Sequence, residues 1–129
     1  MAKQIAVGPV HHLALTVSDL ERSLKFYNDV LGFAQVAEFG ARRILSNGSL
    51  IIGIGTGQHS DDRFDEMRTG LDHISFAVPA RADLERALEV LDEHGVPHGE
   101  IAELAPFGIA ILAFRDPDNI QLELSAPLT

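Results

Sequence analysis

Apolar and polar residues alternate along two stretches of the chain, residues 10–17 and residues 71–78. Alternation with a period of two is typical of a half-buried strand, because successive side chains point to opposite faces. After the first stretch, large side chains change to helical spacing, at Leu20, Leu24, Tyr27 and Leu31. The pattern therefore predicts a strand followed by an amphipathic helix.

Local signals give the expected ends of the helices. Ser18 and Glu21 have the spacing of a capping box, which predicts that the first helix begins at Ser18. Gly32 suits the left-handed position just past its end. The second helix is expected over residues 82–94, where Gly95 closes it.

Three short strands are predicted after each helix. In the first half they cover residues 33–39, 42–46 and 49–55, and in the second half residues 98–104, 108–114 and 120–125. Asn47-Gly48 is a strong signal for a hairpin turn, and the proline-containing segment 116–119 predicts another turn. Each half thus has the element order βαβββ.

The two halves also resemble one another in sequence. His12-Leu-Ala-Leu-Thr-Val17 parallels His73-Ile-Ser-Phe-Ala-Val78, and Leu20-Glu-Arg-Ser-Leu24 parallels Leu84-Glu-Arg-Ala-Leu88. We therefore expect an α+β fold in one domain over residues 1–129, built from two copies of one unit. Module one covers about residues 8–56, a polar linker about 57–70, and module two about 71–126.

Composition narrows the function classes. The chain has 129 residues, 10 Lys and Arg against 19 Asp and Glu, and a formal net charge of −9. Such a surface repels nucleic acid and anionic membranes, so neither is an expected partner. No apolar run is long enough to span a membrane, and we expect a cytoplasmic protein. With no cysteine, disulfides and thiolate metal ligands are excluded, which leaves the six histidines as the notable chemical resource.

Strand alternation places three potential metal ligands on one surface. His12 and His73 occupy equivalent positions in the two repeats, and both alternate with apolar neighbours, as does Glu123. If the helices cover the apolar faces, these three side chains point together into a cleft. Imidazole nitrogen and carboxylate oxygen are suitable ligands for Fe²⁺, Mn²⁺, Zn²⁺ or Ni²⁺. The alternative is that the histidines simply begin strands and Glu123 is a solvated edge carboxylate.

Other polar residues have simpler interpretations. His59 in the linker is a candidate acid or base, against the alternative of a solvated loop histidine. Asp116 and Asp118 fit a plain turn, and the alternation places His11 and Asp72 at the surface or behind the ligands.

Four motifs carry a resemblance to a known family: His12-Leu-Ala-Leu-Thr-Val-Ser-Asp-Leu20, Ser23-Leu-Lys-Phe-Tyr-Asn-Asp-Val-Leu-Gly-Phe33, Gly70-Leu-Asp-His73 and Arg115-Asp-Pro-Asp-Asn-Ile-Gln-Leu-Glu-Leu124. In these motifs the chain resembles the vicinal oxygen chelate superfamily, which includes glyoxalases, bleomycin resistance proteins and extradiol dioxygenases. The resemblance implies paired βαβββ modules that form a cupped, barrel-like mixed sheet with the helices outside. It also implies a divalent metal chelated by adjacent oxygens of a small-molecule substrate, with metal positions at His12, Gly53, His73 and Glu123.

Glycine at position 53 offers no ligand and no base, so the implied set is His12, His73 and Glu123. This set resembles those of extradiol dioxygenases and fosfomycin-modifying enzymes. We therefore favour dioxygenase-type chemistry at Fe²⁺ or Mn²⁺, with Zn²⁺ or Ni²⁺ as other metals. A glyoxalase-like lyase or isomerase and a non-catalytic drug- or metabolite-binding protein are the alternatives.

The resemblance further implies a homodimer. In some relatives the modules pair across subunits, which would place His12 opposite the partner's His73 and the partner's Glu123. The sequence alone leaves open whether the site lies within one chain or between two.

Overall fold

In the computed structural model, which describes residues 3–129, strands and helices follow the βαβββ order twice. The first half contains β1 (His12–Val17), α1 (Leu20–Asp29), β2 (Ala34–Phe39), β3 (Arg42–Ser46) and β4 (Ile51–Thr56). The second half contains β5 (Ile74–Ala77), α2 (Arg81–Glu93), β6 (Ala102–Leu104), the 3-10 helix η1 (Ala105–Phe107), β7 (Ile109–Arg115) and β8 (Gln121–Pro127). The predicted element order is confirmed.

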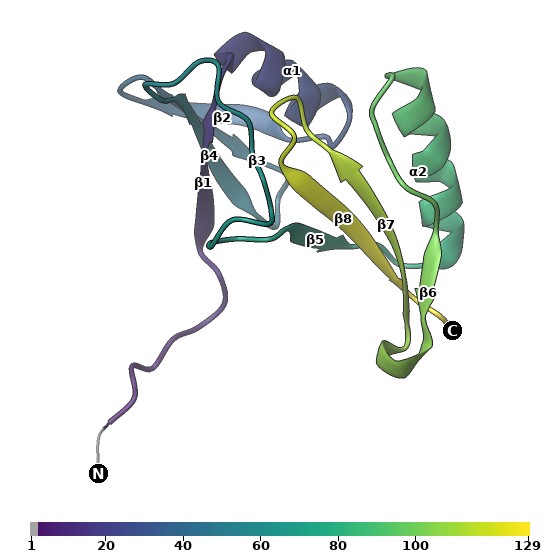
Figure 1. Cartoon of the computed structure of the whole chain (residues 1–129). Helices are drawn as coiled ribbons and strands as arrows, with labels where there is room; N and C mark the ends of the chain where they lie inside the picture. The colour runs from purple at the N-terminus through teal and green to yellow at the C-terminus, as the bar shows by residue number, and fades with distance from the viewer. Residues whose placement is uncertain (1–2) are drawn as a thin grey trace.

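Each half forms its own four-stranded mixed sheet. The strand orders are β1-β4-β3-β2 and β5-β8-β7-β6, so that β1 and β5 are edge strands. In both sheets the first and last strands of the half run parallel, and the remaining pairs are antiparallel. Figure 1 shows the two separate sheets, with α1 over the first and α2 beside the second. The predicted α+β class is confirmed, and both four-stranded sheets are open, which is consistent with the predicted cupped shape.

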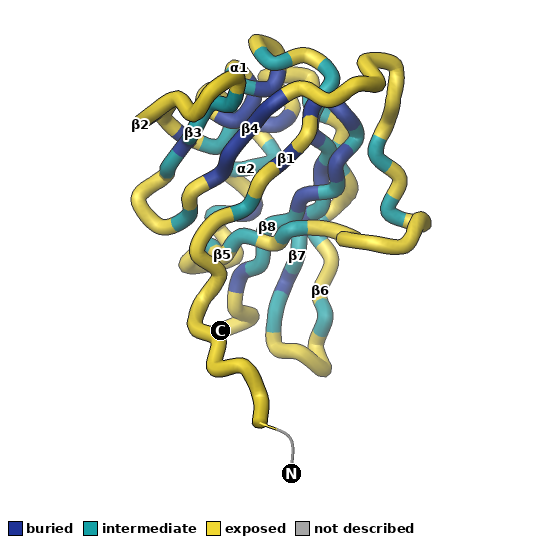
Figure 2. The backbone as a smooth tube through the Cα atoms, turned by 90° about the vertical axis from the view of Figure 1, so that its left-hand side faces the viewer, coloured by how far each residue is buried: buried dark blue, intermediate teal, exposed yellow. Residues whose placement is uncertain are grey.

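One apolar core joins the two halves. It includes Leu15 and Val17 of β1 as well as Leu112 of β7 and Leu122 of β8, all buried. The rings of Phe33 and Phe76 also approach one another across the halves, at 6.0 Å between centroids. Buried residues are visible along β4, β7 and β8, whereas the segment before β1 is exposed (Figure 2). The burial of alternate β1 residues confirms the predicted direction of that strand's apolar face.

The start of α1 differs from the expectation. Asp19, not Ser18, is the N-cap, and its side chain accepts a hydrogen bond from the Arg22 amide at 3.1 Å. The Ser18 hydroxyl instead donates to Asp118, a residue distant in the sequence. This tertiary partner explains why the predicted capping box was wrong.

Several strands are shorter than the alternation predicts. Strand β4 begins at Ile51 rather than residue 49, because the Asn47 side chain accepts hydrogen bonds from the amides of Ser49 and Leu50. Strand β5 begins at Ile74 rather than residue 71. The segment from residue 98 contacts β7 through an isolated bridge between His98 and Phe114, and regular pairing covers only Ala102–Leu104.

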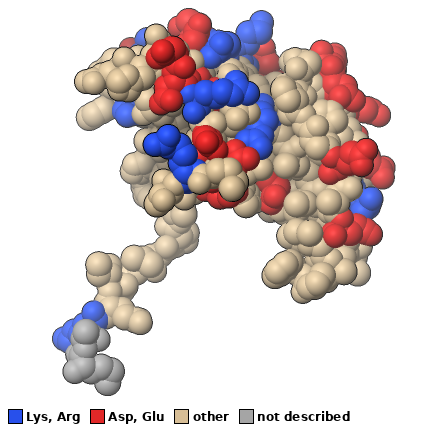
Figure 3. Space-filling view, viewed as in Figure 1, with Lys and Arg blue, Asp and Glu red and all other residues tan. Residues whose placement is uncertain are grey.

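The charged residues are unevenly distributed. Acidic side chains gather over α2 on the right-hand side of Figure 3, where Glu85, Glu89 and Glu93 are exposed. Within residues 3–129, no helix has the length and apolar character needed to cross a membrane.

Candidate metal site and its surroundings

His73 and Glu123 come together at one side of the second sheet. His73 directly precedes β5, and Glu123 lies in β8, where it pairs in register with Ser75. The Nε2 atom of His73 lies 3.6 Å from Oε1 of Glu123. Both side chains are partly accessible, with 39% of His73 and 14% of Glu123 exposed. The parallel pairing of β5 with β8 thus brings two of the three predicted ligands together.

His12 does not join them within one chain. It begins β1, is exposed, and its Nδ1 lies 2.9 Å from Nδ1 of His11. Across the described part of the chain, no cluster of three or more His, Asp and Glu side chains is close enough to share a metal ion. A three-ligand site that includes His12 therefore requires a second chain or a rearrangement of this one.

The other ring nitrogen of His73 has a defined partner. Its Nδ1 lies 2.8 Å from Oδ1 of Asp72. The side-chain amide of Gln121 donates through Nε2 to the same Oδ1 at 2.8 Å and to the backbone carbonyl of Asp72 at 3.3 Å. The sequence predicts Asp72 at the surface or behind the ligands, and its contact with His73 agrees with the second of these positions, whereas Gln121 was not predicted. The available signal was the position of Gln121, which is two residues before Glu123 and therefore on the same face of β8.

Gly53 lies where the resemblance expects a fourth ligand. It is buried in β4 and pairs in register with Ala14. A Cβ atom at this position would lie 3.6 Å from Cδ1 of Ile44, an ordinary van der Waals distance. The glycine is therefore not required by packing, and it keeps this part of the sheet face small.

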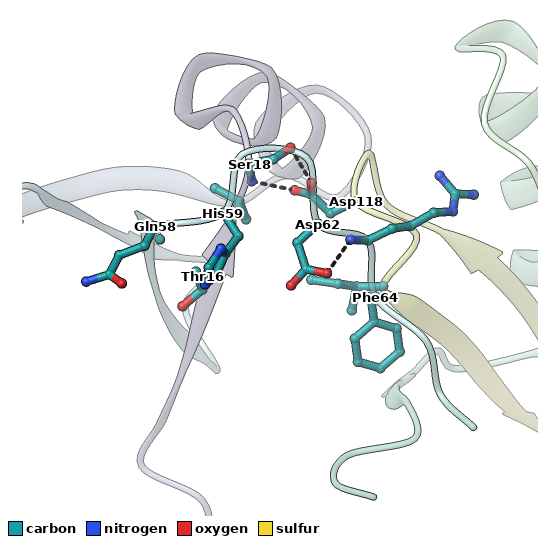
Figure 4. A pocket seen from close by; sticks show the side chains of 11 residues that line it. Thr16, Ser18, Gln58, His59, Asp62, Phe64 and Asp118 are labelled. Atoms are coloured by element: carbon teal, nitrogen blue, oxygen red, sulfur yellow. Dashed lines mark hydrogen bonds between the residues drawn. The ribbon is translucent and has the colours of Figure 1, made fainter. Parts of the chain in front are cut away.

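His59 lies in a separate pocket of about 190 Å³. The pocket lies between the end of β1, the linker and the turn from β7 to β8, and its lining includes Thr16, Gln58, Asp62, Phe64 and Asp118 (Figure 4). Its volume is below the range of roughly 300–1,000 Å³ usual for ligand sites. Thr16 has the same strand parity as His12, so the pocket adjoins the exposed face of β1.

The turn from β7 to β8 is more than the plain turn that the sequence predicts, because its two aspartates are buried and accept hydrogen bonds from the first half. Asp116 is buried, and its carboxylate accepts hydrogen bonds from the Tyr27 hydroxyl and from the amides of Asp118 and Ile120. Burial raises the pKa of Asp116 above its usual value, and it raises that of Tyr27 well above its own. The Ser18 hydroxyl and amide both bind Asp118. These bonds anchor the beginning of α1 to the second half.

The linker is attached to the second half by an ion pair. Arg115 donates to both carboxylate oxygens of Glu66, each at 2.7 Å. These hydrogen bonds lower the pKa of Glu66 to about 2. The Phe64 amide also donates to the Asp118 carbonyl at 2.9 Å. The segment that leads to Asp72 and His73 is therefore fixed on the second sheet.

Two proteins of Bacillus subtilis (strain 168) are similar in sequence. The uncharacterized protein YwkD is 32% identical over 123 residues, which cover 89% of this chain and 94% of YwkD. A catechol-2,3-dioxygenase is 34% identical over 122 residues, which cover 91% of this chain but 41% of the dioxygenase. The chain thus matches less than half of that enzyme.

A solved structure and a family model extend the comparison. The crystal structure of a glyoxylase/bleomycin resistance protein/dioxygenase domain from Frankia sp. EAN1pec superposes with a TM-score of 0.83 at 34% identity, covering 95% of this chain and 93% of that one. The model of the Glyoxalase/Bleomycin resistance protein/Dioxygenase superfamily matches residues 10–124. This chain belongs to the Glyoxalase/Bleomycin resistance protein/Dioxygenase superfamily.

Proposed function

We propose that this protein is a metal-dependent enzyme that acts on a small oxygen-rich molecule, with the metal held by His12, His73 and Glu123. The observation that carries the proposal is the 3.6 Å separation between Nε2 of His73 and Oε1 of Glu123. Two ligand atoms that each lie about 2.0–2.2 Å from one divalent ion are roughly 2.8–3.1 Å apart in octahedral geometry and roughly 3.3–3.6 Å apart in tetrahedral geometry. The pair therefore fits a tetrahedral ion as it stands, and an octahedral ion after a shift of about 0.5 Å.

We propose that His12 comes from a second copy of the chain. His12 is exposed on β1, and β1 and β5 are both edge strands with unpaired outer sides. A homodimer in which module one of one copy faces module two of the other would complete the site. Each dimer then contains two equivalent sites, as expected for two-fold symmetry.

The chain's own residues suit the binding of a substrate beside such a metal. Nitrogen and oxygen donors favour Fe²⁺ or Mn²⁺, with Zn²⁺ or Ni²⁺ also compatible. When bound, the metal would act as a Lewis acid toward adjacent oxygens of the substrate. Gly53 and Ala14 pair in register, so neither places a bulky side chain on the face of β1 and β4 where that substrate would lie. Because Gly53 provides no base, we favour dioxygenase-type oxidoreductase chemistry over lyase or isomerase chemistry, and the similarity to a catechol-2,3-dioxygenase supports this choice.

Metal analysis tests the ligand assignment. Protein purified without oxygen should contain one divalent ion per chain, and His12→Ala, His73→Ala and Glu123→Gln should each lower Mn²⁺ affinity in calorimetry. His94→Ala is a matched control, because His94 contacts the Val90 carbonyl at the end of α2. Unchanged affinity in the three variants would contradict the assignment, and metal-free protein that binds a drug or metabolite would favour the binding-protein alternative.

A complementation experiment tests the shared site. In a mixed dimer of a His12→Ala chain and a His73→Ala chain, one of the two sites regains all three ligands. We expect Mn²⁺ binding to about half of the wild-type amount, whereas sites contained in single chains would all remain defective. Mixed dimers that bind Mn²⁺ can then be screened for activity toward catechols and thiohemiacetals of 2-oxoaldehydes.

A further inference from the structure

We propose that Asp72, braced by Gln121, is a positioning residue that holds the proton of His73 on Nδ1 and leaves Nε2 free on the side of Glu123. The inference rests on the proposed function, because it concerns how one ligand of that site is prepared. It can nevertheless be tested without metal, since the position of the proton is a property of the chain itself.

The hydrogen bond between Asp72 and His73 determines which ring nitrogen carries the hydrogen. Oδ1 of Asp72 lies 2.8 Å from Nδ1 of His73, and an ionised carboxylate can only accept. Nδ1 must therefore carry the hydrogen, so that the lone pair of the neutral ring is on Nε2. Isolated imidazole side chains favour the opposite tautomer. The contact with Asp72 thus selects the form that can donate its Nε2 lone pair to a cation on the Glu123 side.

The side chain of Gln121 holds Asp72 in place. The side-chain amide of Gln121 donates to Oδ1 of Asp72 at 2.8 Å and to the backbone carbonyl of Asp72 at 3.3 Å. Gln121 and Glu123 are two residues apart in β8 and share one face. The same strand therefore supplies one ligand directly and fixes the orientation of the other, which sets the spacing between them.

In the first half, the residue next to the proposed ligand is not a carboxylate. The residue before His12 is His11, whose Nδ1 lies 2.9 Å from Nδ1 of His12. An imidazole can donate or accept at this atom, so His11 does not select one tautomer of His12. The corresponding positions in the two repeats thus differ in chemistry, and only His73 is prepared before the metal binds.

The tautomer can be measured in the metal-free full-length protein by long-range ¹H–¹⁵N NMR, at a pH where the rings are neutral. In the wild type we expect His73 protonated on Nδ1, and in Asp72→Ala a shift toward the form protonated on Nε2. Asp72→Asn should keep the wild-type form, because its amide oxygen can still accept from both His73 and Gln121. Asp92→Ala is the matched control, since Asp92 contacts His98 at 2.6 Å elsewhere on the surface. An unchanged His73 tautomer in Asp72→Ala would overturn the inference.

Metal affinity provides the second readout. Loss of a group that orients a ligand histidine typically lowers metal affinity about 10–100-fold. We expect a loss of this size for Mn²⁺ in Asp72→Ala, a smaller one in Gln121→Ala, and little change in Asp72→Asn or Asp92→Ala. Equal losses in Asp72→Ala and Asp72→Asn would contradict a positioning role. If the wild type binds none of Mn²⁺, Fe²⁺, Zn²⁺ and Ni²⁺, the proposed function fails, while the NMR measurement still decides whether Asp72 sets the tautomer.

Discussion

The hydroxyl of Tyr27 donates a 2.8 Å hydrogen bond to Oδ2 of Asp116. Tyr27 belongs to α1 of the first half, and Asp116 follows β7 in the second half. Both residues are buried, so neither polar group can exchange its partner for bulk water. This contact connects the two repeats. Without it, the Tyr27 hydroxyl and Oδ2 of Asp116 would each lose this hydrogen-bond partner.

Tyr27→Phe should therefore destabilise the protein although it removes only one atom. The buried carboxylate of Asp116 would keep its two amide donors but lose the hydroxyl. Leaving a buried acceptor short of a partner costs about 1–3 kcal/mol in the free energy of unfolding, which urea denaturation can measure. A double-mutant cycle with Asp116→Asn should show strong coupling. Additive effects would contradict a direct interaction.

Substitutions at Ser18 and Asp19 should separate capping from the contact between repeats. Asp19→Ala removes the N-cap and should cost about 0.5–2 kcal/mol. Ser18→Ala should also destabilise, but its effect should be coupled to Asp118→Asn, because Asp118 accepts the Ser18 hydroxyl and amide. Asp19→Ala should be nearly additive with Asp118→Asn. Coupling of Asp19 rather than Ser18 to Asp118 would contradict the assignment.

The ion pair between Glu66 and Arg115 predicts a dependence of stability on pH. The pKa of Glu66 falls from 4.5 to about 2 in the folded protein. A lowered carboxyl pKa stabilises the fold above the unfolded pKa, and this contribution disappears as pH falls through the folded pKa. Glu66→Gln should therefore be less stable than the wild type at pH 6, and the difference should vanish between pH 4.5 and about 2.

Urea denaturation at a series of pH values tests this expectation. Glu85→Gln, which changes an exposed carboxyl of α2, is a suitable control. A constant difference between Glu66→Gln and the wild type over the whole pH range would indicate that the substitution acts through packing and not through the ion pair.

Two glycines should respond differently to substitution by alanine. A Cβ at Gly57 would lie 2.6 Å from Cγ2 of Thr16, whereas a Cβ at Gly53 meets Ile44 at 3.6 Å. Gly57→Ala should therefore cost roughly 1–3 kcal/mol, and Gly53→Ala should be nearly neutral. Thr16→Ser removes Cγ2 and should relieve the Gly57→Ala variant. Thermal unfolding of Gly57→Ala, Gly53→Ala, Thr16→Ser and the double variant Thr16→Ser/Gly57→Ala would show this. An equal cost at both glycines would contradict it.

The sequence by itself determined the order of the elements and the buried faces of the principal strands. In β1 the alternation of Leu15 and Val17 with small or polar neighbours was sufficient, because strand geometry forces adjacent side chains to opposite faces. The helices and the repeat could be predicted equally well, since helical periodicity and glycine at helix ends are local properties. These features depend on residues that are close together in the chain.

Only the tertiary structure decided which polar groups meet. Ser18 has the local spacing of a cap, but Asp118 takes its hydroxyl from the other half of the chain. Likewise, the pairing of β5 with β8 brings His73 to Glu123 and Asp72 to Gln121, while His12 stays outside this set. Such partners depend on strand pairing and on the packing of the two sheets. Alternation specifies the direction of a side chain, whereas the residue that it meets depends on contacts distant in sequence.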